Sequence, residues 1–400
     1  MKFVEKKSTQ ALIQIIRREI KIIINRKSLY ILYFVLPVCI FLLFGTIYMN
    51  SVIRGIPVAF YDEDHSELSN LITRYVASAG SMKIVHYANS IEEIKSEFRK
   101  GNIRGAFYLP HNMEKDIKSG RQVPVMLFIN SKNIIISNYL LSDGSKIIKT
   151  VSGGILLKKL KSGGLMEDQA MSIVNPIKIE TSVLYNPNYS YENYLVPGLS
   201  TFALMMIIIV SSVLLINSEF YHNTFNELVS LSGNKISIIL AGKLIPHLAV
   251  HILNILILTC LIFPLFKIIN NGSGLVLIFF MILFALVTML AGIMVSTFIN
   301  NRMLATELAL FVITPAFIFS GLTFPLWAMP AIFRIIADLI PYTYFLSGYI
   351  KIAQMNAPIK YLIPDIISLT CFLALELAAI IFGLKKAILR SVHQKAEMVK

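Results

Sequence analysis

The chain has 400 residues, of which 56% are hydrophobic and only 15% are charged, and its formal net charge is +14. Soluble domains carry roughly 25% charged residues, so this composition argues against a purely soluble protein. The basic excess does not indicate nucleic acid as a partner. Lys and Arg gather before the first apolar run and after the last one, and they form no patch interleaved with aromatic residues.

Residues 1–27 are predicted to form a cytoplasmic amphipathic helix that connects to the first span. From Ala11 to Asn25, apolar residues fall on one helical face and polar residues on the other. This pattern is typical of a helix that lies in the plane of a membrane interface. Glu19 is an exception inside the apolar arc. It either snorkels or pairs with a basic neighbour, or it contacts a cytoplasmic partner.

Six apolar runs follow, each long enough for the roughly 20 residues that a bilayer core requires. The predicted spans are residues 28–49, 196–216, 236–266, 275–298, 303–322 and 361–384. Basic segments at both ends, including the tail 385–400, place both termini in the cytoplasm, which requires an even number of spans. The sequence therefore predicts a polytopic α-helical membrane protein with six transmembrane helices.

Residues 50–195 read as a water-soluble α/β domain, inserted between the first and second spans on the outer side of the membrane. Strands are expected at 56–61, 83–87, 103–109, 123–129 and 177–184, and helices at 66–79, 90–100, 111–119 and 134–160. Ser90 and Glu93 are predicted to form a capping box. Because strands and helices alternate without a phosphate-binding loop or a nucleophile elbow, we expect a layered docking or gating domain rather than a catalytic one.

Within the five-span domain 196–384, residues 323–360 are interrupted by Pro325, Pro330 and Pro341. Irregular backbone is not tolerated where it faces lipid, so we expect an outer re-entrant region with two short helices, near 329–339 and 342–354. Aromatic side chains suited to the membrane interface are Trp327, Tyr342, Tyr344 and Tyr349. A seventh span is the alternative, but it would leave the basic C-terminus outside.

The third span begins with a polar stripe on one helical face, formed by Lys243, His247, His251 and Asn254. The two histidines have the spacing of a zinc-binding helix, but no Glu follows His247 and no third ligand is evident. We therefore expect hydrogen bonds between helices. The inner loop 217–235 is acidic and aromatic. Its Glu219 and Glu227 would fall within about 80° of each other on one helix.

Several segments, in their order and spacing, resemble the permease subunit of the ABC type-2 export family, in the branch with a large extracytoplasmic domain. They are residues 17–27 with Pro37 in the next span, 194–198, 219–228 with Gly242-Lys243, 320–325, Met329-Pro330 and 341–344. Two positions depart from the family pattern. Asn223-Thr224 stands where Gly-Thr is usual, and Gly233 where Pro is frequent.

The resemblance implies two permease subunits around a central pathway, driven by separate cytoplasmic ATP-binding subunits. The chain contains no Gly-x4-Gly-Lys-Ser/Thr sequence, so it is expected to bind no cofactor and to be no enzyme itself, with ATP and Mg on the partner. Residues implied in coupling to that partner are Glu19, Glu219, Thr224, Glu227 and Leu228. Residues implied in lining the pathway are Phe202, Met205, Phe311 and Phe317.

These expectations describe an exporter permease in a bacterial inner membrane that moves an amphipathic, drug-like or lipid-like substrate. Its expected partners are the ATP-binding subunit, a second permease subunit as a homo- or heterodimer, and membrane lipid. A periplasmic membrane-fusion adaptor stays open, and the pathway aromatics could equally pack or face lipid. The alternative is a mechanical transmitter that an ATPase drives to control an outer partner, although five clustered spans argue against it.

Overall fold

The chain folds into two compact units. The computed structural model describes the backbone of residues 2–49, 53–187 and 189–398. A helical unit contains Met1–Ser51 and Leu184–Lys400, and an α/β unit contains Val52–Val183. Each unit has its own hydrophobic core.

Six helices in the described part of the chain are long and apolar enough to cross a membrane, as the sequence predicts. They are Lys27–Tyr48, Tyr191–Tyr221, Ile236–Leu265, Gly274–Phe298, Arg302–Phe319 and Ile363–Leu389. The second and fourth of these spans are mostly buried against other helices, whereas the first, fifth and sixth are mostly exposed. The second and fourth spans therefore form the centre of the helical unit.

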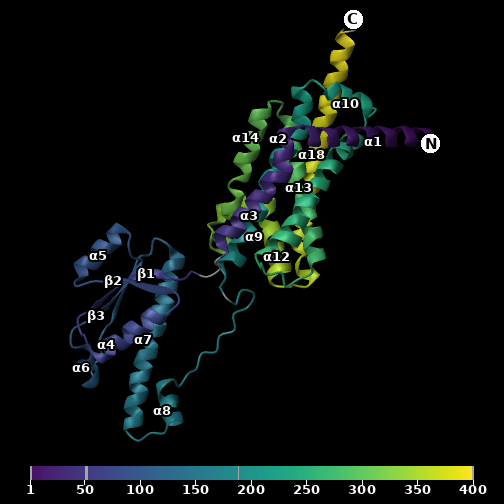
Figure 1. Cartoon of the computed structure of the whole chain (residues 1–400). Coiled ribbons are helices and arrows are strands. Elements are labelled where there is room, and N and C mark those ends of the chain that lie inside the picture. Colours follow the sequence, from purple (N-terminus) through teal and green to yellow (C-terminus); the bar gives the residue numbers. More distant parts are fainter. Residues whose placement is uncertain (1, 50–52, 188, 399–400) are drawn as a thin grey trace. The chain divides into compact units, whose positions relative to one another are not determined.

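The helical unit is built from these elements in chain order. It contains α1 (Lys2–Asn25), α2 (Lys27–Tyr30), α3 (Leu36–Tyr48), α9 (Tyr191–Tyr221), α10 (Phe225–Leu231), α11 (Ile236–Leu256), α12 (Phe263–Leu265), α13 (Gly274–Phe298), α14 (Arg302–Ile313), α15 (Ala316–Phe319), α16 (Ala331–Asp338), α17 (Pro341–Tyr349) and α18 (Ile363–Met398). Figure 1 shows α1 crossing the ends of the spans at a steep angle, at the same end of this unit as α10 and the end of α18.

Two prolines inside spans free a backbone carbonyl that another element then binds. A proline lacks the N–H that would bond the carbonyl four residues earlier. Pro37 follows the π-helical turn Ile31–Val35, and the freed carbonyl of Tyr33 accepts from Asn254 Nδ2 at 3.1 Å. Pro197 in α9 similarly frees the carbonyl of Asn193, which accepts from Gln354 Nε2 at 3.1 Å. The first bond joins the first and third spans, and the second joins the second span to the segment between the fifth and sixth spans.

The segment between the fifth and sixth spans is not a further span. It forms α16 and α17 followed by a π-helical turn, Ile350–Gln354, close to the two short helices expected from the sequence. Trp327 is 81% exposed, as an interfacial residue would be. The expectation is wrong for Tyr342 and Tyr349, because both are buried in the core, where Tyr342 donates to the Gly198 carbonyl at 2.6 Å.

The α/β unit is a four-stranded sheet in the order β2-β1-β3-β4. Its strands are β1 (Ile56–Asp62), β2 (Met82–Tyr87), β3 (Gly105–Leu109) and β4 (Met126–Ile129). β1 is parallel to both β2 and β3, and β4 is antiparallel to β3. Its helices are α4 (Glu67–Ser78), α5 (Ile91–Lys100), α6 (Met113–Lys118), α7 (Ile134–Ser162) and α8 (Glu167–Val174).

The alternation of side chains along β1 and β3 assigns the helices to the two faces of the sheet. Val58 and Phe107 pack in one cluster with residues of α4 and α7. Ala59 and Ala106 point to the other face, where they pack against Ile94 of α5. The small alanines let α5 approach its face closely, so the sheet is covered on both sides.

Two local expectations for this unit need correction. Residues 177–184 form no strand in the structure, and the side chains of Ile177 and Ile179 are exposed, since no sheet edge pairs with this segment. The capping box at α5 is only half formed. The Ser90 hydroxyl accepts from the Glu93 N–H at 3.1 Å, but the Glu93 carboxylate accepts from the Asn89 N–H instead. Ser66 and Ser69 form a full box at α4.

Candidate functional site

The inner loop begins with a defined helix end rather than with a free connector. Asn223 has a positive φ of 55° directly after the last turn of α9. The Thr224 N–H then bonds the Glu219 carbonyl at 2.9 Å, and the Asn223 N–H bonds the Phe220 carbonyl at 3.2 Å. These two bonds form a Schellman motif. Asn223 thus takes the left-handed position of this motif.

The side chain of Glu219 lies at the centre of a polar network and is only 2% exposed. Lys243 Nζ lies 2.7 Å from its Oε1, and Arg18 Nη2 lies 2.7 Å from its Oε2. The Thr224 hydroxyl donates to Oε2 at 2.5 Å. Glu219 therefore joins three elements: α9, which carries it, α1 through Arg18, and α11 through Lys243.

Glu19 is also buried, with 2% exposure, and it shares the Lys243 ammonium. Its Oε1 lies 2.9 Å from Lys243 Nζ and its Oε2 lies 3.3 Å from His247 Nε2. Burial disfavours the charged carboxyl, but the Lys243 charge and the His247 hydrogen bond outweigh this effect and hold the pKa of Glu19 at about 2. Glu19 therefore stays ionised at neutral pH.

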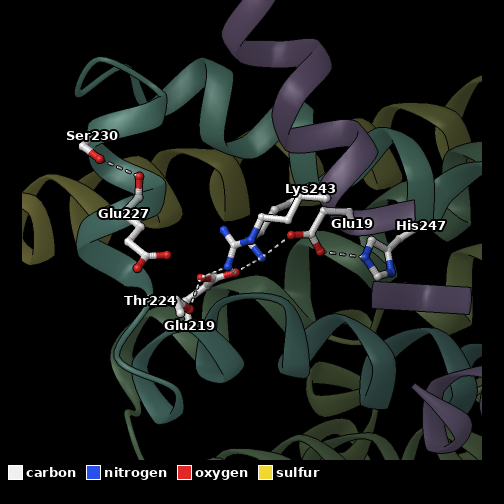
Figure 2. A network of polar contacts seen from close by, with 8 residues as sticks. Glu19, Glu219, Thr224, Glu227, Ser230, Lys243 and His247 are labelled. Atoms are coloured by element: carbon white, nitrogen blue, oxygen red, sulfur yellow. Dashed lines mark hydrogen bonds and ion pairs between the residues drawn. The ribbon is translucent and has the colours of Figure 1, made fainter. Parts of the chain in front are cut away.

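The network continues from His247 into the first span. His247 Nδ1 lies 2.5 Å from the Tyr33 hydroxyl, so an imidazole that carries its proton on Nε2 accepts from Tyr33 and donates to Glu19. The Tyr33 ring also packs edge-on against His251, with ring centres 5.3 Å apart. His251 Nε2 in turn lies 3.3 Å from Ser211 Oγ. Figure 2 shows Glu19, Glu219 and Lys243 converging, with His247 beyond Glu19.

Two buried carboxylates face two cations here, so the charges of the network balance. A buried charge that loses its partner is costly, because water cannot replace the lost interaction. The network forms a junction of α1, α9 and α11, and apolar packing stabilises it. Ile15 of α1 clusters with residues of α10, α11, α13 and α18. A Cβ on Gly242 would lie 2.5 Å from Ile15 Cγ2, so glycine is required where α1 crosses α11.

The residues predicted for coupling are brought to this one region, but not all of them face outward. The side chains of Glu19 and Glu219 are buried. The argument that Glu219 and Glu227 share one helix is also wrong, because α9 ends before α10 begins. Leu228 is fully buried beside Ile15, and Glu227 is exposed. Whether these residues contact a partner stays a prediction.

Sequence reasoning missed Arg18, Lys243 and His247 as partners of the two carboxylates, and it missed Tyr33 as the hydrogen-bond partner of His247. The signal was present, because an acid inside the apolar arc of one helix and a basic stripe at the start of another span are complementary. Both histidines bond other helices, as expected. In the described part of the chain, no group of three or more His, Cys, Asp or Glu could hold a metal ion.

The four residues predicted to line a pathway do not form one surface in this structure. Phe202 and Phe317 pack together with ring centres 5.2 Å apart, and Phe202 also contacts Tyr342 at 5.7 Å. Met205 is buried in the core of the helical unit, whereas Phe311 is 76% exposed. Their role in a pathway stays a prediction.

Six apolar helices with a short helix pair between the last two define a polytopic α-helical membrane protein, and the network places a docked amphipathic helix at one end of the spans. The chain belongs to the ABC-2 family transporter proteins, whose family model matches residues 27–382. It is thus a permease subunit of an ABC transporter. This membership implies a separate ATP-binding subunit and a dimeric arrangement of permeases.

The chain is similar to two permeases of Escherichia coli (strain K12). It is 23% identical to the probable multidrug ABC transporter permease YbhS over 334 residues, which cover 82% of this chain and 85% of YbhS. It is 22% identical to the probable multidrug ABC transporter permease YbhR over 315 residues, which cover 78% of this chain and 81% of YbhR. A match to ABC transporter G family member 20 of Dictyostelium discoideum is 28% identical but covers 45% of this chain and 25% of that protein.

Proposed function

We propose that this chain is the permease subunit of an ATP-driven exporter that moves amphipathic, drug-like or lipid-like substrates out of a bacterial cell. The names of YbhS and YbhR, both probable multidrug permeases, support this substrate class. In this proposal both termini are cytoplasmic, the α/β unit lies outside, and two permease subunits enclose the pathway. ATP and Mg bind to the separate ATP-binding subunit.

The buried charge network carries the proposal. It joins α1, the end of α9 and the start of α11 through ion pairs of 2.7–2.9 Å. Because these pairs are shielded from water, a displacement of α1 or α10 would move the second and third spans instead of being absorbed by a loose loop. A permease that is driven by a separate cytoplasmic subunit needs a rigid connection of this kind between the surface that the subunit contacts and the spans.

The exposed end of the junction offers Glu227 as the contact for the ATP-binding subunit. We expect Glu227→Lys to lower the yield of co-purified ATP-binding subunit and to weaken substrate-stimulated ATP hydrolysis in nanodiscs. The melting temperature of the permease should stay unchanged, because exposed substitutions usually cost under about 0.5 kcal/mol. Glu167→Lys, at an exposed position of α8, is the matched charge reversal and should change neither quantity.

Normal complex yield and normal transport by Glu227→Lys would show that the loop is only a connector. Transport itself is measured as ATP-dependent accumulation of an amphipathic fluorescent dye in inverted membrane vesicles. ATP hydrolysis that moves none of a panel of amphipathic dyes and short-chain lipids would contradict the exporter. That result would favour the mechanical transmitter.

A further inference from the structure

The α/β unit contains an opening at the carboxyl ends of its parallel strands that the transport function leaves unexplained. The opening has a volume of about 730 Å³ and is lined by the ends of β1 and β2, the first turns of α4, and His111 after β3. This volume falls in the range of about 300–1,000 Å³ that is usual for small-molecule sites. Ligands of open α/β sheets bind outside the carboxyl ends of the strands.

The topology explains why the opening forms here. The chain leaves β1 into α4 on one face of the sheet, and it leaves β2 into α5 on the opposite face. The two connecting segments therefore diverge at the carboxyl edge. A tight turn after β1 keeps the entrance clear, because Asp62 Oδ1 accepts from the N–H groups of Asp64 and His65 at 3.0 and 3.1 Å.

The lining carries negative charge. Asp62 and Glu63 both face the opening, and its described lining residues include no lysine or arginine. The Glu63 carboxylate is oriented by the hydroxyl groups of Tyr61 and Tyr108, the latter at 2.9 Å. These two hydrogen bonds hold the pKa of Glu63 below its usual value, so it is ionised at neutral pH.

An aromatic ring lies at the rim of the same opening. Tyr87, at the end of β2, lines the entrance of this opening, and its side chain is 64% exposed. Exposed rings attract cations through their electron-rich faces. A metal ion fits this lining less well, because no three or more His, Cys, Asp or Glu side chains of the described residues are grouped so that they could hold one.

We propose that this opening binds a small organic cation with a flat apolar body, whose charge faces Asp62 and Glu63 and whose body lies against Tyr87. The inference rests on the proposed function, since such a cation belongs to the amphipathic cargo class. It adds a binding site for that cargo in the α/β unit.

The test uses ethidium as the probe and the full-length chain in nanodiscs of zwitterionic lipid, after nuclease treatment. We expect saturable binding by fluorescence anisotropy. The double variant Asp62→Asn with Glu63→Gln should weaken this binding by about tenfold or more, since charge-assisted contacts are lost. At position 62 the amide oxygen still accepts the two turn hydrogen bonds. At position 63 the amide oxygen accepts from one tyrosine hydroxyl and the amide NH2 donates to the other, so the fold is retained. Tyr87→Ala should weaken binding as well, and Tyr87→Phe should not.

Glu167→Gln removes one negative charge from the same unit outside this lining, and it should change the affinity less than about twofold. A second measurement avoids altering the carboxylates. Thr73→Cys, introduced at the lining in a chain without native cysteines, should be protected from maleimide by ethidium and not by an anionic dye. Unchanged affinity in the folded double variant, or no protection of Cys at this position, would overturn the site.

The two proposals fail separately. Ethidium binding is measured at equilibrium without ATP or the ATP-binding subunit, so a negative result leaves the coupling experiment untouched. Conversely, Glu227→Lys lies in the helical unit and should leave ethidium binding unchanged even if it abolishes coupling.

Discussion

At the scale of single residues, Lys243 holds the candidate site together. Its ammonium group bridges Glu19 on α1 and Glu219 on α9, and all three side chains are almost fully buried. If this cation is removed, water cannot reach the two buried carboxylates to compensate for the lost positive charge. The stability of the junction therefore depends on this side chain more than on any exposed pair of the chain.

We expect Lys243→Met to destabilise the helical unit by about 3–5 kcal/mol, because it leaves two buried carboxylates with one remaining cation. Thermal unfolding of the purified protein in detergent would measure this loss. Adding Glu19→Gln to Lys243→Met should restore part of the stability, since Arg18 then balances Glu219. Lys235→Met is the control, because Lys235 is exposed. A Lys243→Met protein as stable as wild type would refute the network's structural role.

The pH dependence of the free energy of unfolding should show the ionisation of Glu19. Its folded pKa of about 2 lies below the ordinary 4.5, so the unfolded state takes up the proton first as the pH falls. This contribution is present above pH 4.5 and is lost between about 4.5 and 2. The stability difference between wild type and Glu19→Gln should therefore be greatest at pH 7 and shrink by about 3 kcal/mol as the medium is acidified.

Unfolding curves from pH 7 to pH 2 would measure this difference. Glu180→Gln removes an exposed carboxylate, 79% accessible, and should stay within about 0.5 kcal/mol of wild type throughout. A constant gap between wild type and Glu19→Gln at every pH would show that Glu19 is not held ionised by its partners.

At the scale of elements, the second and fourth spans form the most enclosed pair, and a glycine sets their distance. A Cβ on Gly292 of α13 would lie 2.7 Å from Ser212 Cβ and 2.9 Å from the Ile209 carbonyl oxygen of α9. Small residues at helix interfaces let backbones approach closely in membranes, where packing drives association. The close contact between α9 and α13 is thus part of the core, and it restricts how these two spans can move relative to each other.

Gly292→Ala should destabilise the helical unit by about 1–3 kcal/mol, because backbone atoms of α9 cannot move aside for the extra methyl group. Gly274→Ala, in the first turn of the same helix, is the matched control. A Cβ there meets Asn270 Nδ2 only at 3.9 Å, an ordinary contact. Equal melting temperatures for the two variants would contradict the close approach of the two spans.

At the scale of the whole molecule, the six spans and the two units are consistent with one topology. An even number of spans returns the chain to the side on which it began, and α1, α10 and the end of α18 lie at one end of the helical unit (Figure 1). The basic residues at both ends of the sequence favour the cytoplasm for that end. In the proposed orientation, the α/β unit, which follows the first span, is therefore expected outside.

Cysteine labelling in intact cells tests this topology. In a chain without native cysteines, we expect Ser131→Cys in the α/β unit to react with an impermeant maleimide, and Ser230→Cys in α10 to react only after the cells are permeabilised. Both positions are exposed, so accessibility within the protein is matched. Reaction at the α10 position in intact cells, with none at Ser131→Cys, would invert the proposed orientation.

The sequence by itself determined the spans and most elements of the α/β unit, because long apolar runs and local periodicity depend on neighbouring residues. The predicted span 236–266 matches Ile236–Leu265, and the expected helix 134–160 matches Ile134–Ser162. The strand expected at 177–184 is absent, since a strand needs a partner edge that its own residues do not specify.

Only the tertiary structure decided what the polar residues inside the apolar segments do. Glu19 lies 224 positions before Lys243, and no local pattern states that the two side chains meet 2.9 Å apart. The same holds for Tyr342, an interfacial aromatic by sequence that the fold buries completely. A buried ion pair or a core contact depends on which helices pack together. The packed helices exclude water from the two side chains, and the interaction between charges is stronger where water is absent.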